Sequence, residues 1–110
     1  MEKLLITTTS FGDIFTQMLK YTEPLLKHYA KKVGADYIPI LKPVYHTADK
    51  SYEKFQMADF LNDYDRVLHI DCDAIVTPNC PNLFDIVPYD HVGGVLDSRD
   101  NTMGTYHLVV

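Results

Sequence analysis

Short apolar segments alternate along this chain with segments of helical period, and this alternation limits the folds that the chain can adopt. Hydrophobic residues recur at spacings of three, four and seven between Ile14 and Val33, as on one face of a helix. Residues 51–64 show a second helical stripe. The apolar segments expected to form strands are residues 3–10, 36–40, 66–70 and 91–97. The order β-α-β-α-β-β predicts an α/β fold, in which helices flank a mostly parallel sheet.

Local signals predict where the helices break and which residues they bury. Pro24 lies inside the first helical segment and predicts either a kink or two consecutive helices, with Thr22 as the cap of the second. Gly34 is expected to end this segment in the left-handed conformation. Residues 79–86 are expected to form a short helical turn. The buried stripe of the helix over residues 51–64 is expected to contain Phe55, Ala58 and either Phe60 or Leu61.

Composition excludes several classes of protein. The chain has 110 residues, enough for one small domain or a part of a larger one. Its net charge of −5 argues against a nucleic-acid partner, because phosphate neutralisation requires a basic surface. No apolar run approaches the roughly 18 to 20 residues of a membrane-spanning helix, so no transmembrane segment is expected. The two cysteines, Cys72 and Cys80, are too few for a disulfide scaffold and predict a reduced, cytoplasmic protein.

Polar clusters directly follow three of the expected strands, at residues 7–10, 71–73 and 97–100. In open α/β sheets, ligands bind beyond the carboxyl ends of the strands. Because the carboxyl ends of parallel strands lie at the same edge of a sheet, we expect the three clusters to converge there. This edge is the candidate binding site.

Asp71 and Asp73 are the candidate metal ligands in this site. Residues two apart in a strand project to the same side, roughly 6.5 to 7 Å apart, so both carboxylates are expected to reach one cation. Two carboxylates without a nearby pair of histidines or thiolates favour Mg²⁺ or Mn²⁺, whose open positions accept substrate phosphates. The alternative is a solvated turn with two ordinary loop acids, because a bare D-x-D pattern is frequent in acidic chains.

His69 and Cys72 flank the two acids and have simpler interpretations. His69 shares the face of Asp71 and Asp73, but it lies further down the strand, inside the packing of the sheet. It is expected to be a packed, hydrogen-bonded core histidine, with metal ligation as the alternative. Cys72 points the other way and is expected to be a small buried apolar residue.

The motifs of this chain resemble those of one known family, in the same order. Residues 64–86, YDRVLHIDCDAIVTPNCPNLFDI, resemble the D-x-D region of the GT-A glycosyltransferases, closest to the family-eight, glycogenin-like group. Residues 4–12, LLITTTSFG, look like the first strand and nucleotide-contacting loop of that family. The further similar segments are KHYAKKVGADYIPI (27–40), YEKFQMADFL (52–61) and HVGGVLDS (91–98).

The resemblance implies a single nucleotide-sugar-binding domain over residues 1–110, with a Rossmann-like GT-A fold. It implies sugar transfer from a nucleotide-diphosphate donor, with a UDP-sugar as the first expectation, to a carbohydrate or glycolipid acceptor. Mn²⁺ or Mg²⁺ is expected to bridge the aspartates and the diphosphate.

The same resemblance implies roles for individual residues. Asp73 is expected to be the main metal ligand, while Asp71 supports the metal and the donor's ribose. The threonines of the first loop would line the nucleotide pocket, Lys54 would meet the phosphate or the donor, and Asp97, the candidate catalytic residue, would touch the transferred sugar. Each residue also has a structural alternative: the threonines as ordinary β-branched strand residues, Lys54 as an exposed helix lysine and Asp97 as a turn acid. The three threonines are Thr7, Thr8 and Thr9.

The chain also departs from the family pattern. The relatives usually have an aromatic residue where this chain has His69, and their asparagine-x-glycine segment is matched only loosely by Asn101 and Gly104. The acceptor-binding half is expected to be missing, so the chain is expected to be a truncated, donor-binding half that binds a nucleotide without turning it over. Exposed apolar surface and an unpaired edge at residues 105–110 would then favour a homo-oligomer.

Two other classes of function fit parts of the sequence. Haloacid-dehalogenase-type phosphatases also place D-x-D after an apolar strand, with a nucleophilic first aspartate and a general-acid second one around Mg²⁺. That motif usually opens the fold, whereas seventy residues precede Asp71, and Ala74 and Ile75 match its next positions poorly. The other alternative is a non-catalytic nucleotide-binding or assembly module in which D-x-D is a remnant.

Overall fold

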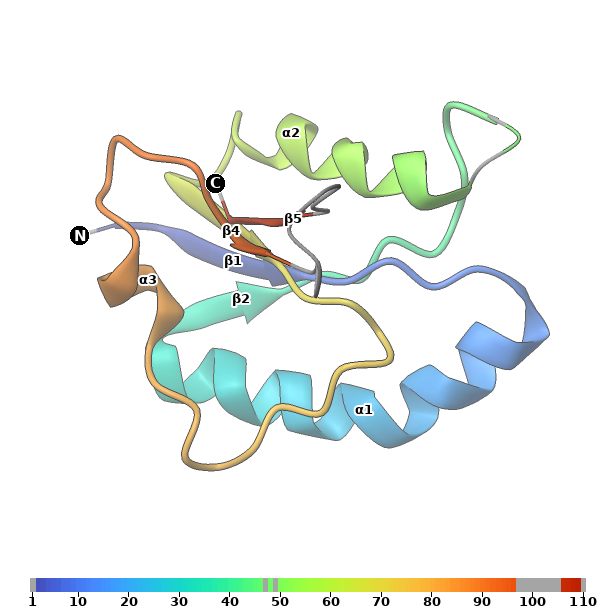
Figure 1. Cartoon of the computed structure of the whole chain (residues 1–110), viewed down its shortest axis with the longest axis horizontal. Coiled ribbons are helices and arrows are strands. Elements are labelled where there is room, and N and C mark those ends of the chain that lie inside the picture. Colours follow the sequence, from blue (N-terminus) through green and yellow to red (C-terminus); the bar gives the residue numbers. More distant parts are fainter. Residues whose placement is uncertain (1, 47, 49, 97–105, 110) are drawn as a thin grey trace.

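The computed structural model describes residues 2–46, 48, 50–96 and 106–109 as one five-stranded sheet with helices on both faces (Figure 1). The helices are α1 (Gly12–Val33), the 3₁₀ helix η1 (Lys50–Gln56), α2 (Met57–Phe60) and α3 (Leu83–Ile86). The strands are β1 (Leu4–Thr7), β2 (Ala35–Tyr37), β3 (Arg66–His69), β4 (Gly93–Leu96) and β5 (Tyr106–Val109), in the spatial order β2-β1-β3-β5-β4.

The strands β2, β1 and β3 form a parallel unit, which confirms the predicted α/β fold. The register places Leu4 of β1 opposite Ala35 of β2 and opposite Arg66 of β3. β5 pairs antiparallel with both β3 and β4, so β4 runs in the same direction as β3. Helical connections link the parallel strands, as the βαβ arrangement requires.

The prediction of an unpaired edge at residues 105–110 is wrong. β5 lies inside the sheet between β3 and β4, and the edge strands among the described residues are β2 and β4. The physical reason is that β5 lies between β3 and β4 and pairs with both, at four residue pairs with β4 and at the pair Leu68 and Val109 with β3, so its backbone groups face neighbours on both sides. Self-association of the chain stays a prediction, to be tested by sedimentation at micromolar concentration.

Both faces of the parallel unit are covered, because successive side chains of a strand point to opposite faces. Ile6 and Leu68 pack with Tyr29 of α1 and Phe84 of α3 in one buried cluster. The residues next to them in the strands, Leu5 and Val67, pack with Met57 of α2 in a second buried cluster. Figure 1 shows α1 along one face of the sheet and η1 with α2 across the other.

The first helix, α1, is continuous, so the two-helix alternative is wrong. Pro24 is exposed inside α1, and Thr22 is a buried helix residue rather than a cap. Gly34 ends α1 in the left-handed conformation with a φ of 76°, as predicted. On the predicted helical face Leu19, Leu26 and Tyr29 are buried and Val33 is half-buried, but Ile14 is 74% exposed, because the first turns extend beyond the sheet. Among the described residues, no helix is long and apolar enough to cross a membrane.

The helix predicted over residues 51–64 is present, but its buried stripe differs from the prediction. Of the predicted residues, Phe60 is half-buried and packs against the second cluster, whereas Phe55, Ala58 and Leu61 are exposed. Glu53 and Met57 are buried instead. The helical segment begins with the seven-residue 3₁₀ helix η1, Lys50–Gln56, and a 3₁₀ helix has about 3.0 residues per turn instead of 3.6. This tighter winding changes which positions face the sheet, so an α-helical stripe does not describe the segment.

Candidate functional site

Two of the three predicted polar clusters meet at the carboxyl ends of β1 and β3. Thr7, the last residue of β1, lies opposite His69, the last residue of β3. The backbone N–H of Ile70 continues this pairing and donates to the carbonyl of Thr7 at 2.9 Å. Residues 7–10 and 71–73 are therefore neighbours, as predicted. The third cluster, residues 97–100, lies outside the described residues, and so does the candidate residue Asp97.

The D-x-D acids lie in a turn and not in a strand, which corrects the geometry expected from the sequence. β3 ends at His69, and the backbone N–H of Ala74 donates to the carbonyl of Asp71 at 3.0 Å. The turn, and not the two-residue repeat of a strand, therefore sets the relative placement of the two carboxylates. Asp73 is exposed and the Asp71 side chain is 37% exposed, so solvent and small ligands can reach both.

Cys72 lies between the two acids and anchors the turn to the core. Its side chain is buried and packs with Leu19 and Leu26 of α1, as the sequence predicted. Burial raises the pKa of the Cys72 thiol, and the negative charges of Asp73 and Asp71 raise it further. The thiol therefore stays protonated and unreactive near neutral pH.

Thr22 holds the same turn from α1, a contact that the sequence did not reveal. Its hydroxyl donates to the carbonyl of Cys72 at 2.8 Å in a buried environment, with a longer contact of 3.4 Å to the carbonyl of Met18. The two bonded residues are fifty positions apart in sequence, so no local pattern could signal this contact.

Removing this hydroxyl is expected to destabilise the protein modestly. Thr22→Val keeps the side-chain shape but leaves the buried Cys72 carbonyl without its donor, which should lower the free energy of unfolding by about 1 kcal/mol. Urea denaturation followed by circular dichroism measures the change. The matched control Thr16→Val, at an exposed position of the same helix, should change it by less than about 0.5 kcal/mol. Equal effects of the two substitutions would contradict a specific role for Thr22.

The three candidate threonines occupy different environments. Thr7 and Thr8 are fully buried, and the carbonyl of Thr8 accepts a 2.7 Å hydrogen bond from Ile40. Their hydroxyls have no hydrogen-bond partner among the described residues. Thr9 is half-buried, and its hydroxyl lies 2.8 Å from Nε2 of His69. Thr9 is therefore the one of the three with side-chain surface open to a ligand.

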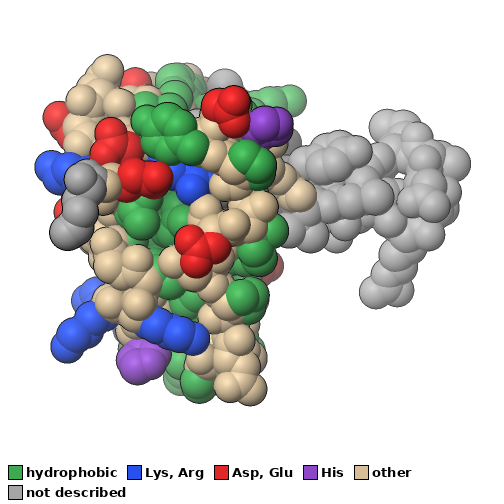
Figure 2. All heavy atoms as spheres, turned by 90° about the vertical axis from the view of Figure 1, so that its left-hand side faces the viewer, with side chains coloured by type: hydrophobic (Ala, Val, Ile, Leu, Met, Phe, Trp, Pro, Cys, Tyr) green, Lys and Arg blue, Asp and Glu red, His purple; other side chains and the backbone are tan. Residues whose placement is uncertain are grey.

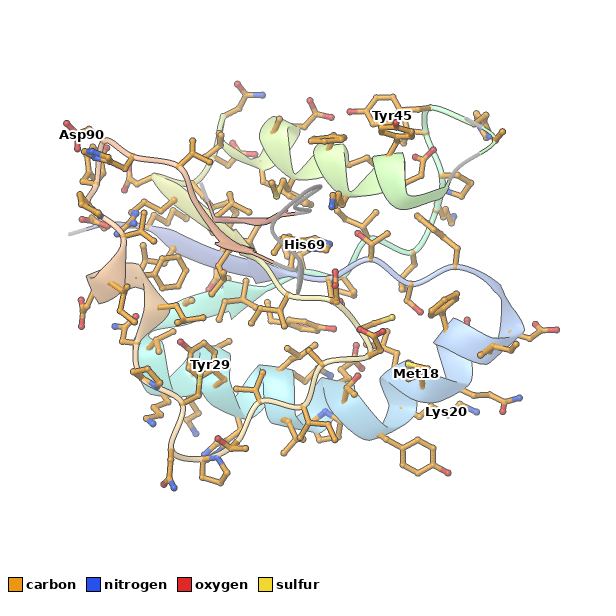
Figure 3. The ribbon with its side chains drawn as sticks, viewed as in Figure 1. Met18, Lys20, Tyr29, Tyr45, His69 and Asp90 are labelled. Atoms are coloured by element: carbon orange, nitrogen blue, oxygen red, sulfur yellow. The ribbon has the colours of Figure 1, made fainter. Side chains whose placement is uncertain are left out.

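His69 is a packed, hydrogen-bonded histidine, as predicted from its position in the strand. Its side chain is 3% exposed. Nε2 contacts the hydroxyl of Thr9, and Nδ1 lies 3.8 Å from Oδ1 of Asp71. In Figure 3 the imidazole lies at the centre of the molecule, where β3 passes into the D-x-D turn. One buried side chain thus contacts both polar clusters of the site.

Lys54 is half-buried in η1, and its neighbour Glu53 has a structural role that the sequence analysis missed. The fully buried Glu53 carboxylate accepts hydrogen bonds from three consecutive backbone N–H groups, of Val44 at 2.6 Å, Tyr45 at 3.1 Å and His46 at 3.0 Å. The Gln56 side-chain amide donates to it at 2.9 Å. This cradle fixes the loop that leads into η1.

The same cradle controls the charge of Glu53. Burial by itself raises the pKa of this carboxyl, but the hydrogen bonds from the loop and from Gln56 outweigh burial and hold the pKa at about 2, below the ordinary 4.5. The backbone of His46 has a φ of 56°, a left-handed conformation that is uncommon outside glycine. The carboxylate therefore holds a loop whose backbone would not favour this conformation alone.

The chemistry of the exposed acids fits a hard divalent ion. Asp71 and Asp73 offer only oxygen donors, the type that Mg²⁺ and Mn²⁺ prefer, and such ions retain several water or substrate ligands. Among the described residues, no three His, Cys, Asp or Glu side chains lie together in an arrangement that could hold a metal ion. Two carboxylates can therefore supply part of a coordination shell, and the rest has to come from a ligand, water or residues outside this set.

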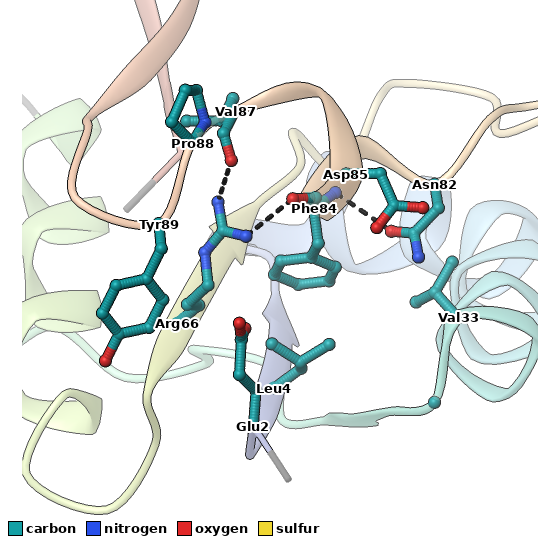
Figure 4. A pocket seen from close by; sticks show the side chains of 11 residues that line it. Glu2, Leu4, Val33, Arg66, Asn82, Phe84, Asp85, Val87, Pro88 and Tyr89 are labelled. Atoms are coloured by element: carbon teal, nitrogen blue, oxygen red, sulfur yellow. Dashed lines mark hydrogen bonds between the residues drawn. The ribbon is translucent and has the colours of Figure 1, made fainter.

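A cavity of about 630 Å³ lies at the opposite end of the parallel strands. Leu4 and Arg66, the first residues of β1 and β3, line it together with Phe84, Val87 and Tyr89. Figure 2 looks onto this end of the molecule, where hydrophobic side chains lie between charged ones, and Figure 4 shows the arginine between the two aromatic rings. The cavity is separate from the D-x-D turn, which follows the carboxyl end of β3.

Neither protein-family models nor curated proteins nor solved structures match this chain. The resemblance of its motifs to glycosyltransferases therefore stays a prediction, and the function has to be inferred from the site itself.

Proposed function

We propose that this chain carries the donor-binding site of a metal-dependent glycosyltransferase of the GT-A type. The observation that supports this most directly is the position of the D-x-D turn. Two solvent-accessible acids directly follow the buried strand β3 and lie beside the threonine segment after β1. Nucleotides bind to α/β sheets at this edge, beyond the carboxyl ends of the strands. The proposed donor is a UDP-sugar, and the proposed acceptor is a carbohydrate or glycolipid.

The charge and exposure of each residue suggest its role in the proposed site. The exposed Asp73 is the main ligand for Mn²⁺ or Mg²⁺, and Asp71 supports the ion and the donor's ribose. The ion, when bound, offsets the negative charge of the diphosphate. Lys54 remains the candidate for a phosphate contact and Asp97 for the transferred sugar. Binding of the donor is the activity that the described residues of this site would support.

Metal-dependent binding of a nucleotide diphosphate tests the proposal. UDP, GDP and CDP are titrated in a thermal-shift experiment, each with Mn²⁺, with Mg²⁺ and with EDTA. Binding at a hundredfold excess over the dissociation constant should stabilise the folded state by about 2.7 kcal/mol, a shift of several degrees for a chain of this size. The shift should occur with one of the diphosphates, with UDP as the first expectation, and should vanish in EDTA.

Asp73→Ala should abolish this shift, because it removes the main ligand of the ion. The matched control Asp85→Ala, an exposed acid at the opposite end of the strands, should bind as the unaltered chain does. No shift with any diphosphate would overturn the proposal and favour the assembly module. Mg²⁺-dependent hydrolysis of p-nitrophenyl phosphate would instead favour the phosphatase.

A further inference from the structure

His69 connects the two halves of the candidate site, and its placement is set by the sheet. As the last residue of β3 it lies opposite Thr7, with its side chain 3% exposed. The two nitrogens of this buried imidazole face two different segments of the chain. Nε2 lies 2.8 Å from the Thr9 hydroxyl, and Nδ1 lies 3.8 Å from Oδ1 of Asp71.

Thr9 is a rigid anchor for this histidine. It forms an isolated β-bridge with Ile40. The hydrogen bonds on either side of it are short: the N–H of Ile40 donates to the Thr8 carbonyl at 2.7 Å, and the N–H of Ser10 donates to the Ile40 carbonyl at 3.0 Å. The backbone therefore holds the Thr9 hydroxyl against His69 before any ligand is present.

The contact between His69 and Asp71 differs from the contact with Thr9. A separation of 3.8 Å is too long for a direct hydrogen bond, but the imidazole still lies within ion-pair distance of the carboxylate. Because His69 is buried and Asp71 is partly exposed, the histidine is the more fixed member of the pair. The buried imidazole therefore limits the orientations open to the carboxylate on that side.

We propose that His69 is a positioning residue for the metal site, with Thr9 as its anchor. The inference rests on the proposed function, in which Asp71 supports the ion. The inference also changes the role expected of Thr9. Its hydroxyl orients His69 and is not primarily a contact for the nucleotide. Partners that orient a ligating carboxylate typically account for a 10- to 100-fold change in metal affinity.

Mn²⁺ affinity, measured by electron paramagnetic resonance in the presence of saturating UDP, tests the proposal. Thr9→Val and His69→Phe should each weaken Mn²⁺ binding about tenfold. Thr9→Ser keeps the hydroxyl and should bind as the unaltered chain does. The double variant should be no weaker than the worse single variant, because both changes break the same chain of contacts. Thermal unfolding without Mn²⁺ and UDP shows whether each variant is folded.

Matched controls separate positioning from general damage. Thr77→Val and His28→Phe change the same residue types at exposed positions and should leave Mn²⁺ affinity unchanged. A purely structural histidine would lower the melting temperature in His69→Phe while Mn²⁺ affinity stayed the same, and that result would overturn the inference. Additive losses in the double variant would overturn it as well, since they indicate independent roles.

The outcomes also distinguish this inference from the proposed function. If Asp73→Ala abolishes Mn²⁺ binding while Thr9→Val and His69→Phe leave it unaffected, the proposed donor site stands and the positioning role of His69 is overturned. An unaltered chain that binds no Mn²⁺ with any nucleotide diphosphate overturns both.

Discussion

Replacing Arg66 with alanine is expected to lower the free energy of unfolding by about 3 kcal/mol, the largest stability effect that we predict for a single substitution in this chain. Arg66 begins β3 and is 4% exposed. Its guanidinium donates to the carbonyls of Phe84 at 2.6 Å and Val87 at 2.7 Å. Both carbonyls lie at the end of α3, where the helix itself provides no donors (Figure 4).

The loss has two parts that a second variant separates. Arg66→Ala removes both hydrogen bonds and the stacking of the guanidinium, whose centre lies 5.6 Å from the centre of the Phe84 ring. Arg66→Met keeps an apolar stem over the ring but leaves the two carbonyls without donors. We expect Arg66→Met to retain most of the destabilisation, because leaving the buried Phe84 carbonyl and the partly buried Val87 carbonyl without donors costs more than the lost packing.

Urea and thermal unfolding measure these changes. A loss of about 3 kcal/mol corresponds to a fall of roughly 10 to 20 °C in the melting temperature of a domain of this size. Lys32→Met is the matched control, since the Lys32 ammonium also donates to two carbonyls, of Pro78 and Cys80, but at an exposed site. Water replaces it there, so its effect should stay below about 1 kcal/mol. Equal losses in Arg66→Met and Lys32→Met would show that water reaches the α3 carbonyls.

Replacing Glu53 with glutamine is expected to lower the melting temperature at neutral pH by roughly 10 °C. Glutamine has one acceptor oxygen in place of two, and its NH₂ group would face the backbone N–H groups of residues 44–46 that the carboxylate now binds. The exposed Asp59→Asn, in the neighbouring helix α2, removes one negative charge without any such cradle and should change the melting temperature little.

The effect of Glu53 should depend on pH in a defined direction. The folded state lowers the pKa of this carboxyl to about 2 from 4.5, so the unfolded chain binds the proton more readily. The stability that Glu53 adds is therefore complete above about pH 4.5 and is lost as the pH falls toward 2. The difference in melting temperature between the unaltered chain and Glu53→Gln should shrink accordingly between pH 7 and pH 2.5. A difference that stays constant over this range would contradict the charged cradle.

Much of the scaffold follows from local signals in the sequence. The strands β1, β2 and β3 were predictable as short apolar, β-branched segments, and the long helix between the first two from hydrophobic residues at spacings of three, four and seven. The end of α1 at Gly34 was predictable as well, since the left-handed conformation there favours glycine. The placement of Asp71 directly after a buried strand followed from the same reasoning.

Other features of the site escaped prediction for identifiable reasons. The turn at Asp71 replaces the expected strand geometry, because β3 ends two residues earlier, at His69. The buried face of η1 differs from an α-helical stripe, because a 3₁₀ helix turns through a different angle per residue. Thr22 looked like a helix cap, since threonine favours that position, yet a distant carbonyl satisfies its hydroxyl inside a continuous helix.

By itself the sequence determined the order of the elements from β1 to β3, the buried face of α1 and the polar residues that follow β1 and β3, because these depend on neighbouring residues. Only the tertiary structure decided that β5 lies between β3 and β4, that Arg66 supports the end of α3 and that His69 joins Thr9 to Asp71. Most of these contacts join residues that are far apart in the chain, and the contact between His69 and Asp71 depends on the turn after β3. Their partners are chosen by packing and by the need to satisfy buried polar groups, which no local period records.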